Sequence, residues 1–135
     1  MAQTTLKTNT RPNLLHRALL ANGMFSTISG LALILFSGLI GNFIGISPSA
    51  ILAGVGAVLV LFGLVVLWVA TRPAISRSLA AAVTILDLVW VAGSILLLIT
   101  GVVPFTPEGK WAVAIAADIV AVFAVLQIIG LRRPQ

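Results

Sequence analysis

The sequence predicts an all-α protein built as a four-helix transmembrane bundle. Hydrophobic residues make up 60% of its 135 residues and charged residues only 8%. No charged residue occurs between Arg17 and Arg72, and two later apolar stretches, 78–103 and 111–131, contain one charge each. About 20 apolar residues suffice to cross a bilayer, so the long uncharged stretch has room for two spans. We therefore expect four spans, at about 18–40, 50–70, 78–101 and 111–131, in one transmembrane domain covering 14–133.

The first two expected helices have recognisable ends. A polar cytoplasmic segment, 1–13, precedes the first helix, and Asn13 can cap a helix that begins at Leu14. We expect this helix to run to about residue 40 and to end at Gly41. Ser47 followed by Pro48 then favours the start of the second helix, because proline lacks an amide that would be unpaired at that position. The second helix should end at about residue 70.

The third and fourth helices have similar start signals. Ser76 or Ser78 can cap the third helix, which we expect to reach about residue 101. Thr106 followed by Pro107 predicts the start of the fourth, and Glu108 there favours the positive end of the helix dipole.

The two hairpins show a weak internal similarity. Segments 30–38 and 93–101 each begin and end with glycine, and each is followed by a Ser-Pro or Thr-Pro pair. This similarity is compatible with two hairpins related as a parallel repeat, but apolar sequence under common membrane constraints produces such matches by chance, and chance is the favoured interpretation.

Basic residues predict the orientation of the bundle. Seven of the eight lie on one side of the membrane by this reading: Lys7, Arg11, Arg17, Arg72, Arg77, Arg132 and Arg133. The loops on the opposite side hold only Glu108 and Lys110. Because lysine and arginine are enriched on the cytoplasmic side, we expect an inner-membrane protein with both termini in the cytoplasm. The lipid bilayer is then the expected partner of these charges, and nucleic acid is not.

A cleaved signal peptide is the competing interpretation of the first span. Its apolar part, 18–40, is longer than the core of a signal peptide, so we expect a permanent helix.

Seven residues form a candidate buried polar network: Asn22, Ser26, Ser29, Asp87, Trp90, Ser94 and Asp118. The two acids are the exceptional members, since at about 1.5 Å per residue Asp87 lies about 15 Å and Asp118 about 12 Å from the nearest membrane boundary. An ionised carboxylate at such depth is costly, so we expect both inside the bundle, each protonated, hydrogen-bonded or reached by water.

The expected partners of the two acids follow from depth and helical phase. Asp87 lies at the level of Ser26, and the Trp90 indole could donate a hydrogen bond to Asp118. Gln127 is about 180° around the helix from Asp118, so we expect it to contact Asn22 instead. Such a network can act as a proton relay or as neutral hydrogen bonding between helices, and both readings stay open.

Small residues at helical spacing predict close helix packing. They include Ser26 with Gly30, Gly56 with Gly63, and the alanines of the fourth helix. We expect contacts within the bundle, with a dimer interface as the alternative.

Catalytic chemistry has little support in the sequence. There is no cysteine, and the single histidine, His16, is expected near the membrane surface, with haem ligation as the weaker alternative. We therefore expect no enzyme activity, no catalytic or metal-binding residues and no cofactor.

Segments 21–26, 87–90, 118–127 and 130–133 resemble a family of small four-helix bacterial integral membrane proteins whose activities are uncharacterised. The resemblance spans most of the chain and implies the fold without an activity. Small multidrug transporters have a similar length and helix number, but they use a membrane-embedded glutamate in the first helix, where this chain offers only Asn22 and hydroxyl groups.

Two functions are expected on these grounds. The first is a non-enzymatic accessory or scaffold subunit of a membrane complex, or a bundle that binds lipid or a small ligand. The alternative is a proton-coupled carrier of small molecules, working as a homodimer through Asp87 and Asp118.

Overall fold

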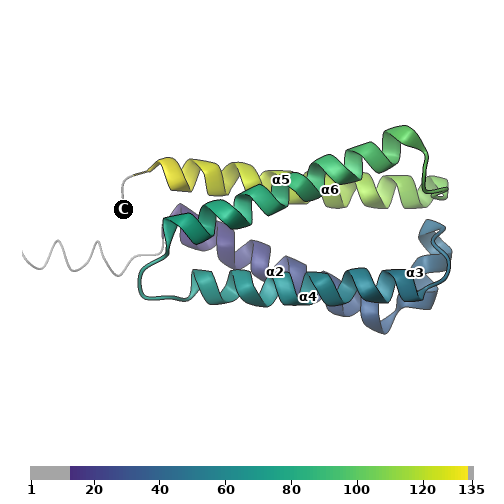
Figure 1. Cartoon of the computed structure of the whole chain (residues 1–135), viewed down its shortest axis with the longest axis horizontal. Helices are drawn as coiled ribbons and strands as arrows, with labels where there is room; N and C mark the ends of the chain where they lie inside the picture. Colours follow the sequence, from purple (N-terminus) through teal and green to yellow (C-terminus); the bar gives the residue numbers. More distant parts are fainter. Residues whose placement is uncertain (1–12, 134–135) are drawn as a thin grey trace, which may run out of the picture.

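The computed structural model describes residues 13–133, in which all regular structure is helical (Figure 1). The elements are α2 (Leu14–Leu35), α3 (Ser37–Ile44), α4 (Ala50–Ala70), α5 (Arg77–Thr100) and α6 (Pro107–Arg132). The helices α2, α4, α5 and α6 are each long and apolar enough to cross a membrane. The chain is thus a small integral membrane protein with four candidate spans.

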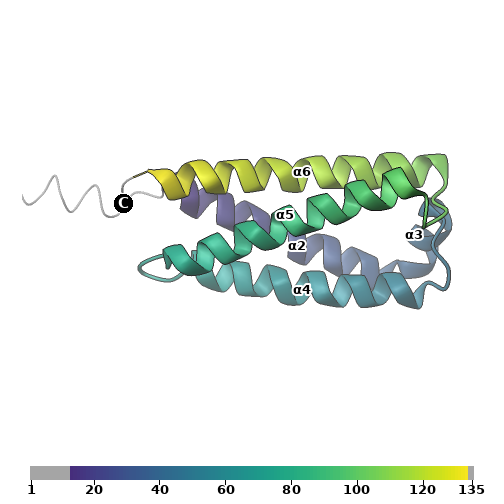
Figure 2. The same cartoon turned by 45° about the horizontal axis from the view of Figure 1, so that its top comes forward.

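The four long helices run back and forth along the long axis of the molecule (Figure 1). The start of α2 and the end of α6 lie at one end, which we call the terminal end, and α3 lies at the other, which we call the α3 end. Viewed from two directions, α2 lies beside α4 and α5 beside α6, so the bundle consists of two helical hairpins (Figures 1 and 2).

Side-chain caps begin three of the long helices, as the sequence predicts. Asn13, Ser76 and Thr106 each accept a hydrogen bond from the backbone N–H three residues later, at 2.8, 3.2 and 2.9 Å. Each cap satisfies an amide that has no partner within its own helix.

The first helix differs from the expectation. It does not run unbroken to residue 40 but ends at Leu35, and α3 follows after a break at Phe36. A Ser37–Gly38 pair follows that break, and such pairs are a common cause of sharp helix kinks. Gly45, not Gly41, ends α3, because its φ of 88° lies in the left-handed region that glycine adopts without strain.

The second helix begins at Ala50, two residues after the expected start. The carbonyl of Pro48 accepts a hydrogen bond from the N–H of Ile51, three residues on, at 3.1 Å. Pro48 therefore belongs to a tight turn that leads into α4, and the regular helical bonds begin only after it.

Glycines allow α2 and α4 to approach closely at two levels. Gly23 and Gly30 of α2 face Gly63 and Gly56 of α4, and a Cβ added to Gly30 would lie 2.6 Å from the carbonyl oxygen of Gly56. A Cβ on Gly63 would likewise collide with Thr27. The expected small-residue packing within the bundle is confirmed for Gly30, Gly56 and Gly63, and Gly23 adds a contact that was not expected.

The two hairpins pack tightly at the terminal end. α5 begins near the end of α4 and diverges from it toward the α3 end (Figures 1 and 2). Where the hairpins meet, an apolar core unites α2, α4 and α5 through Leu15, Leu19, Val66, Val69, Ala70, Ala80 and Val83. We call this part of the bundle the terminal half.

At the α3 end the hairpins are joined through α3. The Thr106 N–H donates to the carbonyl of Ile44 at 3.1 Å, and the Thr106 hydroxyl donates to the carbonyl of Phe43 at 2.6 Å. Gly109 lies against the Ile44 backbone with no room for a Cβ. The start of α6 is thereby fixed to the end of α3.

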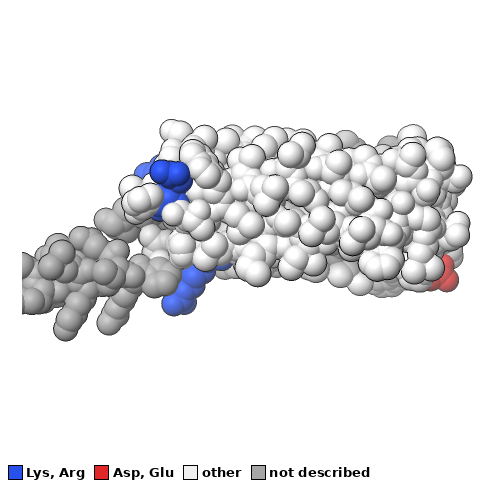
Figure 3. Space-filling model, turned by 90° about the horizontal axis from the view of Figure 1, so that it is seen from below, with Lys and Arg blue, Asp and Glu red and all other residues white. Residues whose placement is uncertain are grey.

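Apart from Asp87 and Asp118, the charged residues described lie at the two ends of the bundle. The basic side chains shown in Figure 3 gather at the terminal end and the acidic ones at the α3 end, while the surface between them is free of both colours on that face. Exposed Leu39, Leu61, Val89 and Ile99 are among the apolar residues of the outer surface, as expected for contact with lipid.

Candidate functional site

Five polar side chains meet near the middle of the bundle. They come from α2, α5 and α6, each is at most 4% exposed, and we call them the polar node: Asn22, Ser26, Thr84, Asp87 and Gln127. In an apolar surrounding, such groups are stable only when they bind one another.

Hydrogen bonds link all members of the node. Asn22 Nδ2 donates to Asp87 Oδ2 at 2.7 Å and to Gln127 Oε1 at 2.9 Å. Gln127 Nε2 donates to Asp87 Oδ2 at 2.9 Å and to Thr84 Oγ1 at 3.1 Å. The Ser26 hydroxyl donates to Asn22 Oδ1 at 3.3 Å, and the Thr84 hydroxyl donates to its own helix at the Ala80 carbonyl. Both amide groups therefore use all of their N–H donors.

Helical spacing brings these side chains together. Asn22 and Ser26 are four residues apart on α2, and Thr84 and Asp87 are three apart on α5, so each pair shares a face. Gln127 lies on the buried face of α6 with Ala117, Val120, Ala124 and Gly130. The node thus ties the α2/α4 hairpin to the α5/α6 hairpin.

The two oxygens of Asp87 have different surroundings. Oδ2 accepts both amide N–H groups, whereas Oδ1 accepts no hydrogen bond from residues 13–133. Yet within the same residues no fully buried side-chain nitrogen or oxygen lacks a partner. Oδ1 must therefore be accessible, and Asp87 lines the cavity described next.

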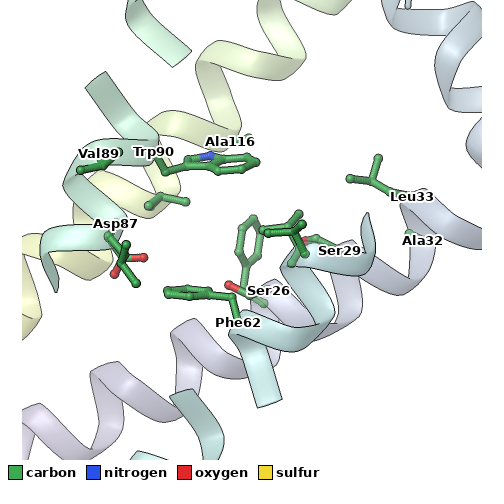
Figure 4. Close-up of a pocket in the computed structure, with 14 residues that line it drawn as sticks. Ser26, Ser29, Ala32, Leu33, Phe62, Asp87, Val89, Trp90 and Ala116 are labelled. Atoms are coloured by element: carbon green, nitrogen blue, oxygen red, sulfur yellow. The ribbon is translucent and has the colours of Figure 1, made fainter. Parts of the chain in front are cut away.

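A cavity of about 560 Å³ begins at Asp87 and extends toward the α3 end. Phe25, Ser26 and Ser29 line it from α2, Phe62 from α4, and Trp90 from α5. Figure 4 shows Asp87 and Trp90 projecting from one side and Ser26 and Ser29 lying on the other. We call the part of the bundle from the node to α3 the cavity half.

Ser29, Trp90 and Ser94 lie outside the node. Ser29 and Trp90 line the cavity, and Trp90 is 38% exposed. Ser94 is buried but donates to the Trp90 carbonyl of its own helix at 2.9 Å. Of the seven residues in the candidate network, the structure brings Asn22, Ser26 and Asp87 into one hydrogen-bonded cluster.

Asp118 lies elsewhere, on the exposed face of α6. The expectation that it is buried and bonded to Trp90 is wrong for a single protomer. The helical phase explains the difference: Gln127 is nine residues away, about 180° around the helix, and faces the node. With Gln127 inside, Asp118 must point outward, beside Ala121, Val122 and Val125.

The node contains two residues that the predicted seven-residue network left out, Thr84 and Gln127. Thr84 precedes Asp87 by three residues, and this spacing was an available signal that both share a face. The expected contact between Gln127 and Asn22 is confirmed by their 2.9 Å hydrogen bond.

His16 has a structural contact. Its Nδ1 lies 2.9 Å from the Ala70 carbonyl oxygen, so the ring donates Nδ1–H to the end of α4. That carbonyl belongs to the last turn of α4, where backbone acceptors lack helical partners. Histidine thus joins α2 to α4 at the terminal end.

Groupings typical of metal sites are not found in the part of the chain described. No three His, Cys, Asp or Glu side chains within residues 13–133 lie close enough together to hold an ion. Comparisons of the chain with protein-family models, with curated proteins and with solved structures give no match. Functional inference therefore rests on the node and the cavity.

Proposed function

We propose that this membrane protein is a non-enzymatic bundle that binds a small apolar ligand, or the apolar part of a lipid, in the cavity between its hairpins. The observation that carries this proposal is the cavity itself, about 560 Å³ in volume, with Asp87 at one end. Ligand sites typically have volumes of about 300 to 1,000 Å³, mostly apolar walls and a few placed polar groups.

The cavity has the composition of such a site. Its walls are built mainly from aliphatic and aromatic side chains, and the polar groups Ser26, Ser29 and Asp87 come from two different hairpins. The node below it is fully hydrogen-bonded apart from Asp87 Oδ1. A ligand would therefore contact the hydrogen-bonded polar node at one end of the cavity and apolar side chains along its sides.

Photolabelling tests this proposal. A neutral arene carrying a diazirine is added to the protein in lipid nanodiscs, and labelled peptides are identified by mass spectrometry. Peptides that contain Phe62 and Trp90 should label saturably and compete with an unlabelled arene, whereas lipid-facing Ile99 should label in proportion to probe concentration.

A filling variant and its control sharpen the labelling experiment. Ala116→Leu adds volume inside the cavity and should abolish saturable labelling, while Ala92→Leu, on an exposed position of α5, should not. Labelling that never saturates, or that both variants leave equally intact, would overturn the proposal.

A proton-coupled carrier is the second candidate. It is favoured by one observation, namely that Asp87 lies within a candidate span and has an oxygen accessible from a cavity. Asp118 could join such a pathway only across a homodimer, because it faces outward. In proteoliposomes, Asp87→Asn should abolish any proton-linked flux of the parent; a flux that survives would exclude Asp87 as the coupling group.

We further propose that both termini face the cytoplasm and that the membrane is the inner one. The distribution of charge between the two ends supports this orientation (Figure 3). The chain has no native cysteine, so Thr71→Cys and Val102→Cys, exposed at opposite ends, can each be probed with a membrane-impermeant maleimide in intact cells. Only Val102→Cys should react; reaction at Thr71→Cys alone would reverse the orientation.

An accessory or scaffold role is compatible with the same structure. Exposed apolar residues along α5, such as Leu88 and Leu96, could contact lipid, a second copy or a larger membrane complex. We prefer ligand binding to this role because the cavity combines apolar walls with a defined polar group, Asp87. The exposed face of α5 is apolar and carries no comparable feature that would identify a partner.

A further inference from the structure

We propose that the ligand of the cavity is a lipophilic ammonium ion, with its positive nitrogen at Asp87 Oδ1 and its hydrocarbon part in the cavity. This inference deepens the proposed function and rests on it. It assigns a charge and an orientation to the ligand.

The chain leaves the negative charge of Asp87 without a cation of its own. No lysine or arginine occurs between Arg17 and Arg72, between Arg77 and Lys110, or between Lys110 and Arg132. The positive groups of the protein therefore lie near the ends of the bundle, while Asp87, 3% exposed, lies near its middle. A buried carboxyl group either stays protonated or pairs its charge, so a cation that pairs with ionised Asp87 has to come from outside the chain.

The hydrogen bonds of the node select Oδ1 as the binding atom. Asn22 and Gln127 direct N–H groups at Oδ2 and so hold the carboxyl group in one orientation. Both are donors, and donors stabilise a negatively charged oxygen. Oδ1 then stays free for a positively charged group in the cavity.

Aromatic side chains next to Asp87 suit a cation with hydrocarbon substituents. Phe25, Phe62 and Trp90 line the cavity, and Figure 4 labels Phe62 and Trp90 close to Asp87. Phe25 is itself held by an edge contact with Phe123, at a ring separation of 5.7 Å. Aromatic faces attract ammonium groups, most strongly where water is excluded. A hydrated inorganic cation would gain nothing from these walls.

Two brominated probes of the same shape test the charge preference. 4-Bromophenyltrimethylammonium and 4-bromo-tert-butylbenzene differ in one central atom and its charge. Binding is read as quenching of Trp90 in a Trp68→Phe/Trp111→Phe protein in nanodiscs, with probe concentrations corrected for partition into empty nanodiscs. We expect the cation to bind at least about tenfold more tightly than the neutral probe.

Asp87→Asn isolates the charge. Asparagine keeps an oxygen for Asn22 and Gln127 to bind, so the node can persist, and thermal unfolding checks that it does. The variant should lose the preference for the cation while still binding the neutral probe. Ser29→Ala, which changes a cavity-lining residue without changing charge, should keep the preference.

The possible outcomes separate the two proposals. If neither probe quenches saturably, the cavity does not bind ligands and the proposed function fails. If both bind with equal affinity, or if Asp87→Asn retains the preference for the cation, the cavity binds ligands but not through an ammonium group at Asp87, and this inference alone is overturned.

Discussion

Leu19, Val66 and Ala80 are fully buried in the terminal half of the bundle, whereas Leu88 and Val89 of the cavity half are 45 and 61% exposed. The same four helices pass through both halves. In the terminal half the hairpins share an apolar core, and in the cavity half they border an open cavity of about 560 Å³. The polar node lies between the two.

This difference arises between the hairpins and not within them. Gly30 and Gly56 keep α2 against α4 beside the cavity, just as Gly23 and Gly63 do nearer the terminal end. α5, in contrast, diverges from α4 toward the α3 end (Figure 2). The hairpins therefore pack against each other in the terminal half and leave between them, in the cavity half, the space in which we propose that a ligand binds.

The node provides the largest expected effect. Asn22→Leu removes two donors and an acceptor, so that Gln127 Oε1 and the Ser26 hydroxyl lose their partners and Asp87 Oδ2 keeps only the donor from Gln127. We expect the free energy of unfolding in mixed micelles to fall by about 3 kcal/mol. Asn42→Leu, the same change at an exposed position of α3, should alter it by no more than about 0.5 kcal/mol. If the free energy of unfolding fell equally in the two variants, the hydrogen bonds of the node would not stabilise the bundle.

The same substitution in the two halves tests their packing. Ala80 is fully buried in the terminal core, and Ala116 lines the cavity. Ala80→Leu should destabilise the protein by about 2 kcal/mol because a packed core has no room for the added atoms. Ala116→Leu fills existing space and should leave the free energy of unfolding unchanged or raise it by up to about 1 kcal/mol. Titration with SDS measures both, and similar losses would show that the cavity half is also closely packed.

Glycine substitutions test the seam between α2 and α4. A Cβ on Gly30 would meet backbone atoms of α4, so Gly30→Ala should cost about 1 to 2 kcal/mol by separating the helices. A Cβ on Gly54 of the same hairpin would meet nothing within 4 Å, and Gly54→Ala should gain up to about 1 kcal/mol from helix propensity. Thermal unfolding in nanodiscs compares the stabilities of the two variants. If Gly54→Ala were the less stable one, the close contact between α2 and α4 would not lie at Gly30.

Asp118 provides the smallest expected effect. Asp118→Asn changes an exposed side chain on the outer face of α6 and should shift the free energy of unfolding by no more than about 0.5 kcal/mol. Quenching of Trp90 by either brominated probe should also be unchanged. A large effect on either quantity would show that Asp118 contacts the binding site, for example across a dimer.

Local signals in the sequence predicted the helices well. Long apolar stretches with at most one charge revealed the four long helices, and Asn13, one of Ser76 and Ser78, and Thr106 marked three of their starts. These signals depend only on neighbouring residues. The contact between Asn22 and Gln127 also followed from depth along the helices, because polar side chains in an apolar surrounding have few alternative partners.

Other features depend on which face of a helix is buried. A membrane helix is apolar on all sides, so the contrast between a polar and an apolar face is weak. For this reason the outward direction of Asp118 became clear only once Gln127 was placed inside. The cavity depends on the crossing of α5 over the other hairpin, which leaves no local signal in the sequence. The break at Phe36 did have a local signal, the adjacent Ser37–Gly38 pair, which the sequence analysis did not use.

The most direct test of the difference between the halves compares one tryptophan near the cavity with one near the terminal end. Trp90 lines the cavity, while Trp68 lies near the end of α4, where Arg72 stacks on its ring at 4.9 Å. Two single-tryptophan proteins in nanodiscs are titrated with neutral 4-bromo-tert-butylbenzene. Quenching of Trp90 should saturate, and quenching of Trp68 should rise only in proportion to the probe dissolved in lipid. Identical, unsaturable quenching of both tryptophans would contradict the account.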